Sequence, residues 1–168
     1  MKLLILISWL SLFSAPDAEV LTYRRMLYAS EKSATMATSF YTITRSLTNE
    51  SAAVKRGYKA MSCFMMSKHV TGPLSKISYF KEGRKELEEA IALSPDNMEL
   101  RFLRFSTQSN TPNFLGYKNS MADDKARILK QLKSGVQAGD QDLYDKIYTF
   151  MLNSEYCSAE EKKLIHLN

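Results

Sequence analysis

The amino-acid sequence predicts an all-α protein, with about eight helices in consecutive antiparallel hairpins. Its 168 residues are 45% hydrophobic and 24% charged, which supplies enough apolar surface for one core. Only six glycines and four prolines interrupt the chain, fewer than a fold of many short strands needs for its turns. Between these breaks, apolar residues recur every three or four positions, the spacing of helices that bury one face.

Residues 1–18 have the pattern of a signal peptide, ahead of a single helical domain at 19–168. Lys2 is followed by an apolar stretch too short to span a bilayer, which takes ~20 residues, and then by small residues. The cleavage position stays open, because Pro16 disturbs both candidate sites. The alternative is the first helix of a cytosolic protein, but such a helix normally has a charged face. We therefore expect an exported protein, periplasmic or secreted, without stable membrane insertion after processing.

The order of the helices follows from their caps and breaks. They are expected at residues 17–29, 31–47, 49–69, 74–93, 97–109, 120–135, 140–152 and 158–167. Side chains that accept hydrogen bonds from a helix's first amides stand at several starts, as single caps or capping boxes: Asp17, Asn49, Asp96 with Glu99, Ser120 with Asp123, and Ser158 with Glu161. Breaks are expected at Gly72-Pro73, at Ser94-Pro95, in the irregular stretch 110–119 and at Gly135.

Each helix has a stripe of apolar residues that predicts its buried face. In the second helix the stripe is Met36, Phe40, Ile43 and Leu47, and in the third it is Ala53, Val54, Gly57, Tyr58, Met61, Phe64 and Met65. In the fourth it is Ile77, Phe80, Leu87, Ala90 and Ile91. In the sixth it is Ile128, Leu129 and Leu132, and in the seventh it is Leu143, Tyr144, Ile147, Phe150 and Met151.

One stretch of the fourth helix resembles the second half of a tetratricopeptide repeat. A small residue, a large apolar residue, alanine and proline follow one another at Gly83, Leu87, Ala90 and Pro95. With its less regular first half, this similarity covers about a quarter of the chain, and no second copy follows at a fixed distance. The resemblance implies a helical hairpin in which Gly83 and Ala90 allow close approach of two helices.

A second resemblance involves three short motifs. Glu-Leu-Arg-Phe-Leu-Arg-Phe at 99–105, Asn-Phe-Leu-Gly-Tyr at 113–117 and Asp-Asp-Lys at 123–125 are similar to an uncharacterised group of small bacterial exported proteins. That group has no assigned activity. The resemblance therefore implies export and a helical fold, and it implies no reaction.

The best candidate site combines one helix face with the loop that follows it. Arg101, Arg104 and Gln108 share a face of the fifth helix, and the loop at 110–117 could fold over that face. With the loop residues Asn113, Phe114 and Tyr117, they could bind a carboxylate or a peptide end. The alternative is that both arginines pair with neighbouring acidic residues while the loop's apolar side chains pack into the core.

Other constellations favour structural roles. Met61, Met65 and His69 share a helix face and could bind monovalent copper, but methionines at such a spacing are typical of a core. Cys63 and Cys157 match no metal or redox spacing, although one long-range disulfide stays open. The histidines, serines and glycines form no catalytic or phosphate-binding motif. We therefore expect no cofactor, no metal site and no catalytic residue.

The predicted function is an exported binding module for a peptide or protein partner. The net charge of +5 comes from 23 basic and 18 acidic residues that are interspersed, so nucleic acid is not an expected partner. Helical hairpins stacked in series present a face on which side chains from successive helices converge. Two alternatives stay open: an exported, hydrolase-like enzyme whose site forms only in three dimensions, and a structural component of an envelope assembly. The oligomeric state is not predicted.

Overall fold

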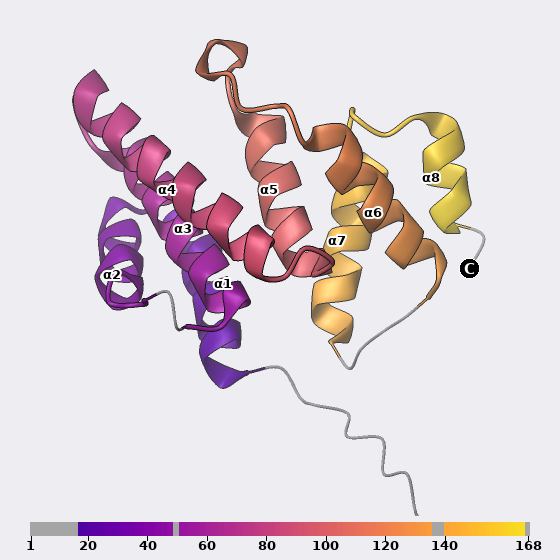
Figure 1. The fold of residues 1–168 in the computed structure, drawn as a ribbon, viewed down its shortest axis with the longest axis horizontal. Helices are drawn as coiled ribbons and strands as arrows, with labels where there is room; N and C mark the ends of the chain where they lie inside the picture. The colour runs from indigo at the N-terminus through magenta and orange to yellow at the C-terminus, as the bar shows by residue number, and fades with distance from the viewer. Residues whose placement is uncertain (1–16, 49–50, 136–139, 167–168) are drawn as a thin grey trace, which may run out of the picture.

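The computed structural model describes residues 17–48, 51–135 and 140–166 and confirms the all-α class. In this part of the chain eight α-helices and one short 3-10 helix follow one another without a strand (Figure 1). Their bounds are α1 Ala18–Ser30, α2 Ala34–Thr44, α3 Ala53–His69, α4 Pro73–Leu93, α5 Met98–Asn110, η1 Asn113–Leu115, α6 Met121–Lys133, α7 Gln141–Asn153 and α8 Ala159–His166. The expected leader up to residue 16 and the expected cap at Asn49 lie outside the described residues.

The start of α2 and its buried face differ from the prediction. Ser33 caps this helix by accepting a hydrogen bond from the amide of Met36, so α2 begins later than expected. The face directed at the neighbouring helices consists of Ala37, Phe40 and Thr44. Ile43 is 49% exposed, so its prediction as a buried residue is wrong.

Two of the three expected capping boxes are absent, and the third is complete. Asn97 rather than Asp96 caps α5, and its side chain accepts from the amide of Leu100. Glu99 is thus free for an ion pair elsewhere. Ser120 precedes α6 without a side-chain cap. At α8, Ser158 and Glu161 accept a hydrogen bond from each other's backbone amide, and this box is confirmed.

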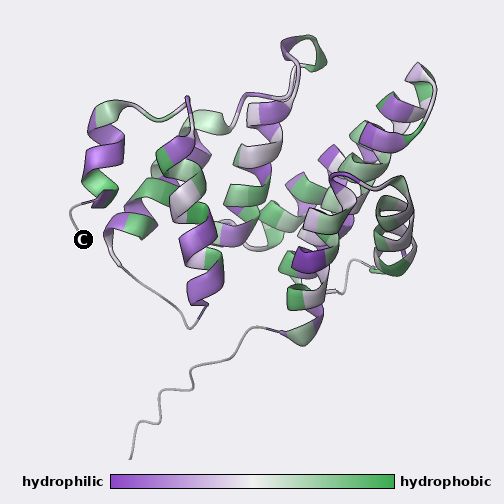
Figure 2. Cartoon of the chain, turned by 180° about the vertical axis from the view of Figure 1, so that it is seen from behind, coloured by the Kyte–Doolittle hydropathy of each residue, from purple (hydrophilic) through white to green (hydrophobic). Residues whose placement is uncertain are grey.

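The core consists of two apolar clusters that meet at α5. The first joins α1 to α5 and contains Phe40, Tyr58, Leu87, Leu100 and Leu103 among others. The second joins α5 to the last three helices and contains Phe105, Ile128, Leu132, Ile147 and Met151 among others. Figure 2 shows hydrophobic and hydrophilic residues alternating along each helix, as expected when one face of every helix is buried. No helix in the described ranges is long and apolar enough to cross a membrane.

Helices α3 and α4 approach each other closely at Gly83, which has no space for a side chain. A Cβ atom at this position would lie 2.9 Å from the backbone oxygen of Ala60 and 3.1 Å from the Phe64 ring. Ile77 lies on the same helix, ahead of this contact. It is 40% exposed, so its prediction as a buried residue is wrong.

We expect the Gly83→Val substitution to lower the free energy of unfolding by about 1–3 kcal/mol, because the overpacked helices must move apart. Urea unfolding followed by circular dichroism measures this change. Ser78→Val is the matched control, because Ser78 is exposed on the same helix and its replacement should stay within about 0.5 kcal/mol. Equal stability of the two variants would contradict the close approach of α3 and α4.

Candidate functional site

The alternate helices α1, α3, α5 and α7 line one groove with a volume of about 1120 Å³. Because the helices follow one another as hairpins, every second helix faces this side of the molecule (Figure 1). Among the described residues of the even-numbered helices, only Phe80 of α4 reaches the lining. Pro112 and Leu115 close one end of the groove, from the segment after α5.

Most of the deep lining is apolar. It includes Leu27, Tyr58, Met61, Phe64, Met65, Phe80, Phe102, Leu103, Leu143 and Phe150. The groove face of α5 also has the polar residues Ser106, Thr107 and Asn110. The outer rim has charges of both signs: Glu31, Lys68, Asp142, Asp145 and Lys146. This combination of an apolar floor and a mixed polar rim suits an amphipathic ligand.

A buried ion-pair network fixes the base of the groove. Arg24 of α1 donates to both carboxylate oxygens of Glu99 on α5, at 2.6 and 2.9 Å. Tyr58 of α3 donates to the same carboxylate at 2.5 Å. The third guanidinium nitrogen of Arg24, Nη1, lies 2.7 Å from Asp140, the cap of α7, as an ion pair without the alignment of a hydrogen bond. All four lining helices are therefore joined at this one point.

Two members of this network, Tyr58 and Arg24, have shifted pKa values. Burial raises the pKa of the Tyr58 hydroxyl, and the negative charge of Glu99 raises it further. Burial by itself lowers the pKa of Arg24, but the hydrogen bonds and charge of Glu99, together with the nearby carboxylate of Asp140, raise it above its usual value. Tyr58 is therefore neutral and Arg24 charged at neutral pH.

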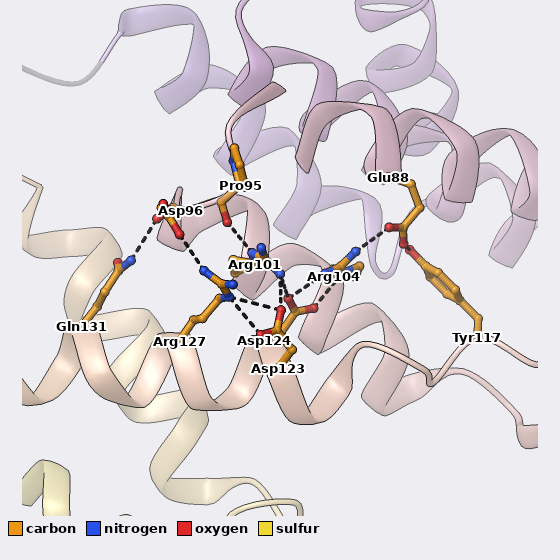
Figure 3. Close-up of polar contacts among 10 residues, drawn as sticks. All are labelled: Glu88, Pro95, Asp96, Arg101, Arg104, Tyr117, Asp123, Asp124, Arg127 and Gln131. Atoms are coloured by element: carbon orange, nitrogen blue, oxygen red, sulfur yellow. Dashed lines mark hydrogen bonds and ion pairs between the residues drawn. The ribbon is translucent and has the colours of Figure 1, made fainter. Parts of the chain in front are cut away.

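Arg101 and Arg104, the expected binding residues, point away from the groove toward α6. Arg101 is 2.8 Å from one oxygen of Asp124 and from Asp123, and it donates to the carbonyl of Pro95 at 2.6 Å. Arg104 donates to both oxygens of Asp124, at 2.7 and 2.8 Å, and also pairs with Glu88. Figure 3 shows both guanidinium groups converging on the first turn of α6. The pairing with neighbouring acidic residues that the sequence left open is thus present.

The remaining expected site residues are not brought together. Gln108 is 1% exposed, and its side-chain oxygen has no hydrogen-bond partner in the described chain. Tyr117 is buried, and its hydroxyl donates to Glu88 at 2.9 Å. Asn113 and Phe114 are exposed on η1, and Phe114 is not packed into the core.

The groove face of α5 is the feature that the sequence analysis missed. Ser106, Thr107 and Asn110 lie on the side of the helix opposite to Arg101 and Arg104. The available signal was their spacing, because these small polar residues continue the stripe that begins at Phe102 and Leu103. The charge of Arg101 and Arg104 led the sequence analysis to predict binding on the other face.

The soft ligands of α3 and the two cysteines serve packing. Met61 and Met65 line the groove, whereas the ring of His69 lies 2.6 Å from the carbonyl oxygen of Ser30. In the described ranges, no group of three or more His, Cys, Asp or Glu side chains is placed to hold a metal ion. Cys63 and Cys157 are both buried and free. Burial raises the pKa of Cys63 to about 12, and the nearby Glu82 adds to this shift.

Comparisons with known proteins identify no relative: no family model, no curated protein and no solved structure matches this chain. The groove is therefore interpreted from its own geometry.

Proposed function

We propose that this chain is an exported binding module that holds a peptide or a segment of a partner protein in the groove between α1, α3, α5 and α7. The observation that carries the proposal is the groove itself, about 1120 Å³ in volume with a mainly apolar lining from four helices. Export rests on the leader pattern at residues 1–18 and on the resemblance to small bacterial exported proteins.

The size and lining of the groove favour a chain-like ligand over a compact small molecule. Small-molecule sites usually have volumes of about 300–1,000 Å³, and this groove exceeds that range while remaining open along the helices. Met61 and Met65 lie in its lining, and methionine adapts easily to side chains of different shape. The alternating use of helices is also what a tetratricopeptide-like stack of hairpins would produce, and we include that likeness in the proposal.

The site we propose differs from the face centred on Arg101 and Arg104. Both guanidinium groups are buried and form ion pairs with Asp124 and its neighbours. Their positive charges are therefore already paired and do not face a ligand. On the opposite face of α5, Ser106 and Asn110 provide polar groups beside apolar surface. A bound peptide could satisfy its backbone there and bury its apolar side chains below.

Blocking the groove tests the proposal. Thr149 is an exposed groove residue of α7, and a Thr149→Trp substitution places an indole in the ligand's path without altering the core. Short peptides selected from a displayed random library on the full chain serve as probes. We expect their affinity, measured by fluorescence anisotropy, to fall at least about tenfold, a loss of roughly 1.4 kcal/mol.

Thr42→Trp is the matched control, because Thr42 is an exposed threonine of α2 away from the groove. The selected peptides should bind this variant with the same affinity as they bind the unchanged chain. If the selection yields no binding peptides, or if both variants bind equally well, the groove is not the binding site.

A further inference from the structure

The first two turns of α4 contact the last turn of α3 on one side, where Ser67 donates to the carbonyl oxygen of Lys76 at 2.8 Å, and are open to solvent on the other. Residues 71–78 are all exposed, and Leu74 is 83% exposed. Leu74, Ile77 and Lys81 are spaced by three and four residues, so they form one stripe on the helix surface. Leu74 and Ile77 therefore display apolar surface with no neighbour to cover it.

The 3-10 turn η1 adds a second apolar projection at the same end of the molecule. Phe114, in the middle of this turn, is 84% exposed. The segment is anchored beside α4, because the ring of Tyr117 contacts Phe80 at 5.8 Å and the guanidinium of Arg84 lies 5.0 Å from its centre. Figures 1 and 2 both show the start of α4 and the turn after α5 at the upper edge of the molecule.

The two chain segments that form this end have basic but no acidic side chains. Residues 66–81 and 110–119 contain no acidic residue, although the whole chain has 18. Lys68, Lys76 and Lys81 are exposed lysines of these segments, and Lys81 continues the stripe of Leu74 and Ile77. The next acidic residue along α4 is Glu82, which is half-buried and interacts with Cys63. We call this end the basic tip, defined by Lys68, Leu74, Lys76, Ile77, Lys81 and Phe114.

We propose that the basic tip is a peripheral contact site for an anionic membrane surface. Phe114, Leu74 and Ile77 enter the interface between headgroups and acyl chains, while the three lysines remain among the anionic headgroups. The charge complementarity favours lipid over a protein partner, because a mainly positive patch with isolated apolar projections fits a fluid anionic surface without specific pockets. The groove opens beside the tip, since Lys68 also lines its rim. A partner held there would thus lie close to the membrane.

A fluorescent label beside Phe114 tests this contact separately from any binding through the leader. Asn113 is exposed and adjacent to Phe114, so an Asn113→Cys variant of the full chain accepts a polarity-sensitive dye there. The two native thiols are buried and stay unlabelled under native conditions. With vesicles of phosphatidylglycerol and phosphatidylcholine we expect a blue shift and quenching by brominated acyl chains. The same dye at Ala92→Cys, exposed near the other end of α4, should show neither change.

Substitutions in the labelled chain test the two parts of the tip. Lys76→Ser with Lys81→Ser should weaken partition of the label into anionic vesicles at least about tenfold, whereas Lys130→Ser with Lys163→Ser should change it little. Phe114→Ser should reduce the blue shift, whereas Leu93→Ser, at a residue 57% exposed elsewhere, should not. No response beside Phe114 on vesicle-bound chains, or an equal response on purely zwitterionic vesicles, overturns the proposal. A response to a protein but not to vesicles overturns it in favour of protein docking.

Discussion

Replacement of Asp124 by asparagine is expected to lower the free energy of unfolding by about 3–5 kcal/mol, the usual cost of removing one partner from a buried ion pair. The Asp124 side chain is fully buried and accepts hydrogen bonds from both Arg101 and Arg104. Burial by itself lowers the pKa of Arg104, but the bonds and charge of Asp124 raise it above its usual value. Without that carboxylate, two buried guanidinium groups lose their main counter-charge. Urea unfolding measures the loss.

Asp123→Asn provides a matched control for this prediction. Asp123 is the preceding residue in the first turn of α6 and also contacts Arg101, but 55% of its side chain is exposed. Solvent screens such a pair, so this substitution should cost less than about 1 kcal/mol. Comparable losses from the two aspartates would mean that burial does not decide the strength of these contacts.

Replacement of Glu99 by glutamine should have the second large effect, again about 3–5 kcal/mol. Glu99 of α5 accepts hydrogen bonds from Arg24 of α1 and Tyr58 of α3 at the base of the groove. The uncharged amide cannot balance the buried guanidinium, which retains only Asp140. Thermal unfolding at neutral pH measures the effect. The same variant should also weaken binding of the selected groove peptides, because Glu99 of α5 joins α1 and α3 directly and is connected to the cap of α7 through Arg24.

The control is Glu19→Gln, which removes a carboxylate that joins α1 to Lys55 of α3 at the surface. With 61% of its side chain exposed, this pair should contribute about 0.5 kcal/mol. A stable Glu99→Gln variant with full peptide affinity would show that the buried network does not shape the groove.

The sequence predicted features that depend on neighbouring residues along the chain. Helix order, the complete capping box at Ser158 and Glu161, and the stop at Gly135, with a positive φ of 62°, are set within a few residues. The expected stripes of α3 also reached the core, because Tyr58, Met61 and Phe64 are buried. Ile43 and Ile77 followed the same spacing but remained exposed, since no neighbouring helix extends over them.

The candidate site depended on which charges meet in space. The fifth helix has a charged face and a small polar face, and the sequence alone favoured the charged one. In the structure the charged face is occupied by ion pairs within the protein. Asp124 of α6 pairs with both Arg101 and Arg104, and Glu99 pairs with Arg24 rather than closing a capping box.

By itself, the sequence determined that this chain forms a series of amphipathic helices, because helix periodicity and caps are local properties. Only the tertiary structure decided that α1, α3, α5 and α7 share a groove and that Arg101 and Arg104 do not face it. The physical reason is that burial of a charge requires a partner from a distant segment. The pairing of such segments is fixed by the packing of whole helices rather than by the residues next to either charge.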